Sequence, residues 1–234
     1  MNIVSVKNKL PLRIFIPNVW WFLVFTLVFT CVVFLTINKT ENISSISSYP
    51  AFTTIAIDAG HGGIDGGATG NGLIEADINL QISEALQETL SSLSFQTVMT
   101  RTGDYGLYGT TLPGFKKRDM LARKEICESG GADILVSIHL NASILTDRTG
   151  VVIYCDTKNA QSLEIANAIA SQLENAVVRH GDFFITTKIN MPAVLIECGF
   201  ITTASEAEKL ATAEYRQEIA DDIAKGILKY QLGI

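Results

Sequence analysis

The sequence predicts an α/β protein: a single three-layer domain in which helices flank a twisted, mostly parallel or mixed sheet, preceded by one N-terminal transmembrane helix. Three observations support this prediction. Short β-branched runs alternate with segments of helical periodicity over residues 51–234, polar residues follow the apolar runs, and an uncharged apolar stretch occupies residues 19–37. The 234 residues, 47% of them hydrophobic, can bury one core of ordinary size and are too apolar for a disordered chain.

Residues 19–37 have the properties of a membrane segment. They carry no charge, and two tryptophans lie near their start, where indole rings favour the membrane interface. Three basic residues in segment 1–18 place that segment in the cytoplasm by the positive-inside rule, with the rest of the chain on the far side. The apolar run is longer than a usual signal-peptide core and no clear cleavage site follows, which favours an uncleaved anchor over a cleaved signal. A buried core helix is the weaker alternative.

The polar, serine-rich residues 38–50 are typical of a linker.

The predicted elements alternate along residues 51–234. The first is a β-branched run that ends at glycine-rich residues, and the next is a helix whose isoleucines and leucines recur on one face. Gly130 and Gly131 are typical of a helix end. The predicted strands are 54–58, 95–101, 133–139, 151–155, 183–186 and 193–197, and the predicted helices are 77–93, 117–129, 159–175 and 214–230.

Charge and cysteine content narrow the classes of partner and site. The formal net charge is −6, and the basic excess of the first fifty residues leaves the remainder more acidic still, which argues against nucleic acid as the main partner. Cys31 lies in the apolar run. Cys127, Cys155 and Cys198 show neither a disulfide framework nor a CxxC metal spacing, so we expect them to be unpaired and mostly buried.

Three metal-ligating side chains lie next to predicted elements. His61 follows the first strand in a glycine-rich segment, Glu75 precedes the first long helix, and His139 ends the third strand. Ligands gather at the carboxyl ends of strands in such sheets. Two histidines and a glutamate are a known ligand set for catalytic zinc, which keeps its fourth position for a water whose pKa it lowers to about 7.

Glu197 is the candidate for proton transfer. It ends the apolar strand 193–197, where its carboxylate can take a proton from water and pass it to a leaving nitrogen. Each residue also has a structural interpretation: a loop hydrogen bond for His61, a core histidine for His139, a helix-start carboxylate for Glu75 and a rim charge for Glu197. All four residues are predicted to lie at strand ends or at a helix start of one sheet, which favours a single site that they form together.

Other reactive side chains are expected outside this site. His180 lies in a polar turn, and Cys198 faces the opposite side of the strand from Glu197. The basic residues at 116–118, 123 and 124 are typical of a solvated helix face, or alternatively of a contact with an anionic glycan.

Three segments resemble the zinc-dependent N-acetylmuramoyl-L-alanine amidases, the amidase_3 family, and occur in the family's order. They are DAGHGGIDGGATGNGLIEADINL, SIHLNAS and MPAVLIECGFITTASEAEKL, and the resemblance covers roughly residues 54–231. It implies a catalytic domain over residues 51–234, one Zn²⁺ per chain held by His61, Glu75 and His139, and Glu197 as base and then acid. The implied substrate is the amide between the lactyl group of N-acetylmuramic acid and L-alanine of the peptidoglycan stem peptide.

The anchor, the single catalytic domain and the lack of recognisable wall-binding repeats are similar to the germination-specific amidases of endospore formers, the CwlD type. Residues 105–123 also resemble that subgroup's insertion. The resemblance implies a role in spore cortex maturation and germination, with stem-peptide removal preceding muramic-δ-lactam formation by a polysaccharide deacetylase. It further implies a catalytic domain held outside the cytoplasm at the cortex side of the forespore membrane, and an accessory protein as a partner.

One position departs from the family pattern. Many members carry Arg or Gln where this chain has Thr187. Candidate substrate contacts are Asn141, Arg118 and Arg179. Thr187 is short and uncharged, so Arg179 or a partner protein would supply the substrate contact that Arg or Gln makes at this position in other members. Two alternative functions remain: a non-catalytic peptidoglycan-binding or regulatory module, and a zinc peptidase that cuts between stem amino acids.

Overall fold

The computed structural model describes residues 53–234, together with Trp20, Leu23 and residues 25–30. The chain divides into two units, Met1–Pro50 and Ala51–Ile234.

The described residues of the first unit are helical and exposed. Most of the predicted segment 19–37, and all of the predicted segments 1–18 and 38–50, lie outside the described residues. Across the part of the chain that is described, no helix combines the length and the apolar character needed to cross a bilayer.

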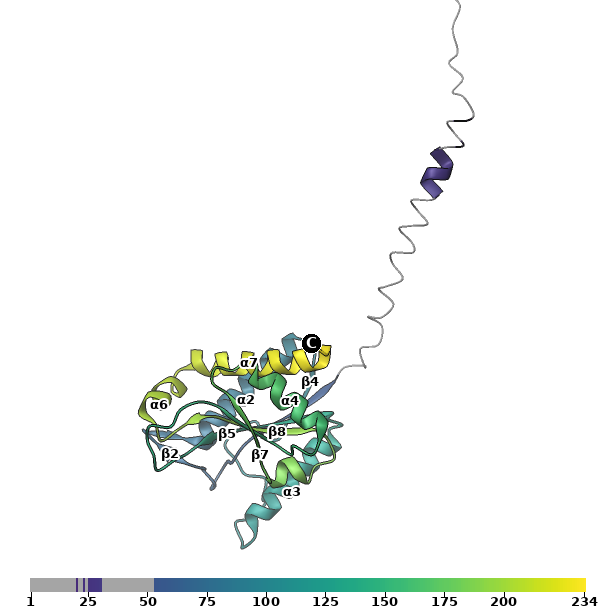
Figure 1. Cartoon of the computed structure of the whole chain (residues 1–234). Coiled ribbons are helices and arrows are strands. Elements are labelled where there is room, and N and C mark those ends of the chain that lie inside the picture. Colours follow the sequence, from purple (N-terminus) through teal and green to yellow (C-terminus); the bar gives the residue numbers. More distant parts are fainter. Residues whose placement is uncertain (1–19, 21–22, 24, 31–52) are drawn as a thin grey trace, which may run out of the picture. The chain divides into compact units, whose positions relative to one another are not determined.

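A six-stranded mixed sheet is the middle layer of the second unit (Figure 1). Its strand order is β4-β1-β5-β8-β6-β7, with β6 antiparallel to β8 and every other neighbouring pair parallel. A small hairpin, β2 with β3, precedes the first helix. The strands are β1 Thr54–Ala59, β2 Thr69–Gly70, β3 Leu73–Ile74, β4 Gln96–Met99, β5 Ile134–Asn141, β6 Val152–Cys155, β7 Val177–His180 and β8 Ala193–Phe200.

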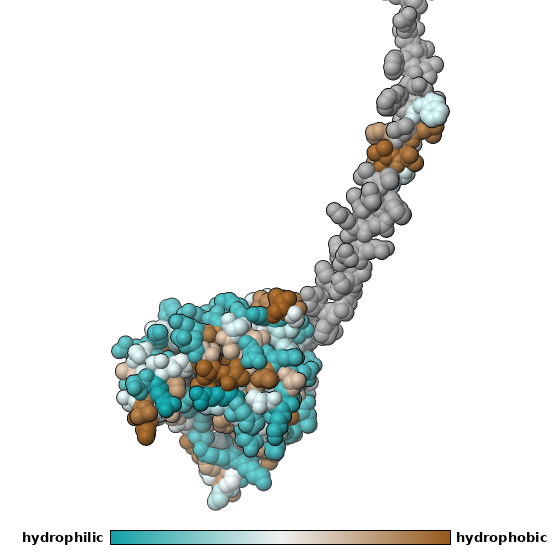
Figure 2. All heavy atoms as spheres, viewed as in Figure 1, coloured by the Kyte–Doolittle hydropathy of each residue, from teal (hydrophilic) through white to brown (hydrophobic). Residues whose placement is uncertain are grey.

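Helices cover both faces of this sheet, which confirms the predicted three-layer α/β fold (Figure 1). One face is covered by α2 (Glu75–Ser92), α4 (Ala160–Ala170) and α7 (Ala213–Leu232), and the other by α3 (Phe115–Ser129) and α5 (Phe184–Thr187). Helix α6 (Ala204–Leu210) follows β8. The surface in view in Figure 2 is largely hydrophilic with separate apolar patches.

The alternation of strand side chains makes the two faces different. Ile57, Ile138 and Ile196 belong to the large apolar cluster beneath α2, α4 and α7. On the other face, only six buried apolar residues form a second cluster: Ala56, Cys127, Leu135, Ile185, Ala193 and Leu195. Toward the carboxyl ends of β1, β5 and β8, this face carries the polar residues Asp58, Ser137, His139 and Glu197.

Two predicted elements were wrong. Residues 183–186 were predicted as a strand, but residues 184–187 form the short helix α5 and Phe183 is its N-cap. A short apolar run has no resolvable period, so its pattern does not distinguish strand from helix. The helix predicted to reach residue 175 ends at Ala170. It is followed by the unpredicted strand β7, a mostly exposed edge strand that lacks an apolar repeat and includes His180.

Candidate active site

Three elements bring His61, Glu75 and His139 together at the carboxyl ends of the central strands. His61 lies in the loop after β1, Glu75 begins α2, and His139 lies in β5. Nε2 of His61 is 3.2 Å, and Nδ1 of His139 is 3.0 Å, from Oε1 of Glu75. One ligand atom from each residue lies within 4.8 Å of the others, so the group could hold a metal ion.

Hydrogen bonds fix the Glu75 carboxylate. Its Oε2 accepts a hydrogen bond from the backbone N–H of Ala68 at 2.7 Å, and Oε1 accepts one from the N–H of Leu140 at 3.2 Å. Burial alone would raise the pKa of Glu75, but the hydrogen bonds and charges of His139 and His61 outweigh it and hold the pKa well below its usual range. The carboxylate is therefore ionised, as a metal ligand must be.

The loop that carries His61 has an unusual backbone. His61 has a φ of 61°, a left-handed conformation that few non-glycine residues adopt. Its Nδ1 lies 3.3 Å from Oδ2 of Asp65, which orients the ring and leaves Nε2 facing Glu75. A Cβ on Gly60 would lie 2.4 Å from the ring of His139, so only glycine fits there. The loop thus brings the two imidazoles to a centroid distance of 5.0 Å.

Glu197 lies beside His139 across the β5–β8 ladder. The two residues are partners in the parallel register, so their side chains leave the sheet on the same face. Oε2 of Glu197 is buried, and no described residue donates a hydrogen bond to it. Burial raises the pKa of Glu197 above its usual range, and the imidazoles of His139 and His61 offset only part of that effect. A carboxyl with a free oxygen and a raised pKa suits proton transfer.

An irregularity in the ladder follows this pair. The register shifts so that Asn141 pairs with Phe200, which leaves one extra residue in β8. Gly199 there has a φ of 147°, and the N–H of Phe200 donates to Oε2 of Glu206 at 2.7 Å. Such bulges occur next to active sites, where they end the pairing and redirect side chains.

A cavity of about 430 Å³ joins the three candidate ligands and Glu197. Its opposite wall is apolar and comes from α3, α5 and the loop before α3. Lys116 is the one lysine or arginine among its lining residues, and its Nζ lies 3.3 Å from Oδ2 of Asp65. The apolar wall consists of Tyr108, Phe115, Met120, Phe183, Phe184 and Ile185. A cavity with reactive polar groups on one side and an apolar wall on the other suits an uncharged amide with small apolar substituents.

The predicted substrate contacts lie outside or at the edge of this cavity. Asn141 ends β5, between strand and loop residues that line the cavity, while Arg179 is exposed on the edge strand β7. The guanidinium of Arg118, on α3, donates to carbonyls of the loop before that helix, at Tyr108, Thr110, Leu112 and Pro113. The hydroxyl of Thr187 donates to the carbonyl of Phe183. Their roles in substrate binding stay predictions.

Buried polar side chains beneath the site were missed from the sequence. Arg123, predicted on a solvated helix face, is fully buried and pairs with Asp58 and Asp119. Arg101 is buried as well, at 1% exposure. The sequence did contain a signal, because Asp58 and Ser137 occupy alternating positions of otherwise apolar strands. A carboxylate buried in such a strand needs a partner, which would have indicated a buried basic side chain.

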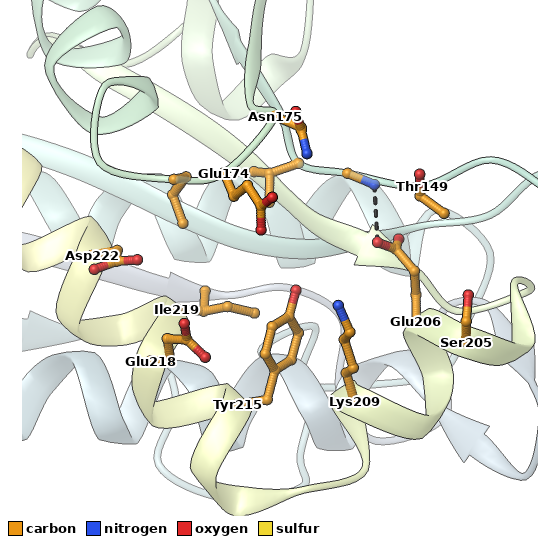
Figure 3. A pocket seen from close by; sticks show the side chains of 13 residues that line it. Thr149, Glu174, Asn175, Ser205, Glu206, Lys209, Tyr215, Glu218, Ile219 and Asp222 are labelled. Carbon is orange, nitrogen blue, oxygen red and sulfur yellow. Dashed lines mark hydrogen bonds between the residues drawn. The ribbon is translucent and has the colours of Figure 1, made fainter.

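A second cavity, of about 530 Å³, lies among α6, α7 and the loops that precede β6 and β7 (Figure 3). Its walls carry the carboxylates of Glu174, Glu206, Glu218 and Asp222 around Tyr215. The pKa of Tyr215 is raised to about 12 by burial and by the charges of Glu206, Glu218 and Glu174. Glu206 accepts a hydrogen bond from the N–H of Gly150 at 2.9 Å. Within the described part of the chain, one group alone has three potential ligand atoms close enough for a metal ion. It consists of His61, Glu75 and His139 and is called the His61 group below.

Comparisons with known proteins agree with this geometry. Residues 55–229 match the family Amidase_3, N-acetylmuramoyl-L-alanine amidase. The uncharacterized protein YqiI of Bacillus subtilis (strain 168) is 38% identical over 184 residues, covering 76% of this chain and 84% of that relative. The germination-specific N-acetylmuramoyl-L-alanine amidase of the same organism is 32% identical over 187 residues, covering 75% of this chain and 78% of the relative.

A solved structure shows the same architecture. The CwlD amidase from Clostridioides difficile, in complex with the GerS lipoprotein, superposes with a TM-score of 0.74 at 33% identity, covering 78% of this chain and all of that one. The family match spans most of the chain and includes all three residues of the His61 group and Glu197. This chain belongs to the Amidase_3 family and is an N-acetylmuramoyl-L-alanine amidase.

Proposed function

We propose that this amidase is zinc-dependent, with His61, Glu75 and His139 as the zinc ligands and Glu197 as the catalytic carboxylate. The observation that carries the proposal is the pairing of Glu197 with His139 in the β5–β8 register, which brings the Glu197 carboxylate to the cavity that the three candidate ligands line. Two imidazoles and one ionised carboxylate are a donor set that suits Zn²⁺ and leaves a position for water.

The chain's own groups account for proton transfer. When bound, zinc supplies a Lewis acid that polarises the lactyl carbonyl and lowers the pKa of a bound water. The Glu197 carboxylate accepts a proton as water attacks the carbonyl carbon, and then donates it to the L-alanine nitrogen as the C–N bond breaks. The apolar wall formed by α3 and α5 contacts the substrate's methyl groups and excludes bulk water from the reacting carbonyl.

The proposed biological role is in spore cortex maturation and germination, upstream of a deacetylase that completes muramic-δ-lactam formation. Similarity to a germination-specific amidase and to an amidase solved with a lipoprotein supports this role and an accessory protein partner. The apolar residues 19–37 and the basic residues before them support a membrane anchor that holds the catalytic domain outside the cytoplasm.

Mass spectrometry of the products tests the function. The purified full chain is incubated with peptidoglycan from vegetative cells and from spore cortex, with and without a chelator. We expect release of whole stem peptides with a new N-terminal L-alanine, abolished by the chelator and restored by Zn²⁺. Shortened stems still attached to the glycan would show a peptidase, and an intact polymer would show a binding module.

A further inference from the structure

Two buried arginines converge on the loop that carries His61. Arg101 donates from Nε to the carbonyl of Ala59 at 2.9 Å and from Nη2 to that of Gly60 at 2.9 Å. Arg123 donates from Nη1 to the carbonyl of Ala59 at 2.7 Å and from Nη2 to that of His61 at 2.6 Å. Two guanidinium groups thus donate hydrogen bonds to the carbonyls of three successive residues.

The same network reaches the element that carries Glu75. Nη2 of Arg101 also donates to the carbonyl of Ala76, the residue after Glu75, at 2.7 Å. Asn79, one turn further along α2, donates to the carbonyl of Gly60 at 3.2 Å and to Oε1 of Glu75 at 3.4 Å. The first turn of α2 and the His61 loop are therefore tied to each other through shared donors.

The network extends to the strand that carries His139. Asp58 Oδ1 accepts hydrogen bonds from Arg123 Nη1 at 2.7 Å and from the Thr100 hydroxyl at 2.8 Å. Its Oδ2 accepts one from Ser137 Oγ at 2.6 Å, and Ser137 lies two residues before His139 on the same face of β5. All three ligand-bearing segments are joined within one buried set of hydrogen bonds.

The chemistry of this network favours arginine over any other residue. Burying a guanidinium is costly unless each donor finds an acceptor, and here the acceptors of Arg101 are backbone carbonyls rather than a carboxylate. A guanidinium can donate to several carbonyls from three nitrogens that lie in one plane. A lysine side chain has a single nitrogen and cannot reproduce that arrangement. The loop needs this restraint because His61, a non-glycine residue, has a left-handed backbone conformation that is unfavourable unless the surrounding structure holds it.

We infer that Arg101 and Arg123 are positioning residues that hold the backbones of His61, Glu75 and His139 at the separation a metal ion requires. The inference rests on the proposed function, because it takes these three residues to be the zinc ligands. It predicts that zinc affinity, and not only folding stability, depends on side chains that never touch the metal.

The test compares the zinc affinity of the full chain with that of Arg101→Lys and Arg123→Lys, by competition with a chromophoric chelator. Arg216→Lys is the matched control, since Arg216 on α7 also donates to a carbonyl, that of Leu210, away from the site. We expect zinc binding weakened about 10- to 100-fold in the first two variants and unchanged in the control. At saturating zinc, kcat should fall while KM stays within about twofold, because neither arginine lines the cavity.

Folding defects are separated from positioning by a milder variant. Ser137→Ala keeps both arginines and removes only the hydroxyl that links Asp58 to β5, and we expect severalfold weaker zinc binding with a cooperative melting transition retained. Variants that are folded but less stable, and bind zinc as tightly as the natural chain, would overturn the inference and leave the proposed function standing. A natural chain that binds no zinc would overturn the proposed function, and the inference with it.

Discussion

On the face covered by α2, α4 and α7, the three central strands present isoleucines to a continuous apolar cluster. On the face covered by α3 and α5, alternate residues of the same strands include Asp58, Ser137, His139 and Glu197. A single sheet therefore separates a core that stabilises the domain from a polar layer that orders an active site.

The difference shows how the domain can accommodate a site of buried charge. Buried charges reduce stability unless they are paired, so a small domain cannot place them on both sides of its sheet. The apolar face supplies the free energy of folding, which permits the other face to keep an unpartnered carboxylate at Glu197 and two buried arginines. The predictions below test whether function and stability separate in this way.

The largest expected effect is on activity, from Glu197→Gln. Removing the proton-transfer group should lower kcat roughly 10²- to 10⁴-fold. The melting temperature should not fall, because burial raises the pKa of Glu197 and its ionised form therefore opposes folding at neutral pH. Stem-peptide release and thermal unfolding measure the two effects, and a marked drop in melting temperature would contradict the separation of the two faces.

Leu86→Ala on the other face should produce the reverse pattern. Leu86 is fully buried in α2 within the large apolar cluster, so its truncation should lower the free energy of unfolding by about 2–5 kcal/mol. Chemical denaturation measures that loss. The kcat of the protein that remains folded should equal that of the natural chain, and a reduced kcat would show that the two faces are coupled.

Acid stability should report on the polar layer. Burial would raise the pKa of Asp58, but the charge of Arg123 and the hydrogen bond from Ser137 lower it from 3.8 to about 2. Because the folded-state pKa is depressed, this contribution of about 2 kcal/mol is present above pH 4 and is lost as the pH falls toward 2. Denaturation at a series of pH values should show this loss in the natural chain, and a flatter profile in Asp58→Asn.

The smallest effect is expected in the second cavity. Glu174 is exposed and lines that cavity (Figure 3), whose lining includes none of the candidate ligands. Glu174→Gln should change the free energy of unfolding by less than about 0.5 kcal/mol and leave stem-peptide release unaltered. Loss of activity in this variant would mean that substrate contacts extend to the α6–α7 side of the domain.

The same division explains which features were predictable from the sequence. Elements of the apolar face, such as α2, α7, β1 and β5, repeat apolar residues at helical or strand spacing, so their existence was predictable to within a few residues at each end. Strand β7 and helix α5 lack such a repeat, because one is an exposed edge strand and the other has four residues. Both were missed.

The candidate site was partly readable in the same way. His61, Glu75, His139 and Glu197 adjoin ends of predicted elements, and the resemblance to a family gave them roles. The arginines beneath them were not readable, because their partners are mostly backbone carbonyls far along the chain. Every residue has a backbone carbonyl, so the sequence does not indicate which carbonyls accept a hydrogen bond from an arginine. It also does not distinguish a buried arginine from a solvated one.

The β5–β8 ladder has a consequence for how such an enzyme can vary. Neighbouring strands lie about 4.8 Å apart, so the spacing between His139 and Glu197 is set by backbone pairing and by none of the connecting loops. Insertions in the loops around the rim would leave this spacing intact. A slip of β8 by a single residue would instead turn the carboxylate into the apolar layer. Changes of length are therefore compatible with the site at the periphery, whereas a change of length within either of these two strands displaces one of its two side chains.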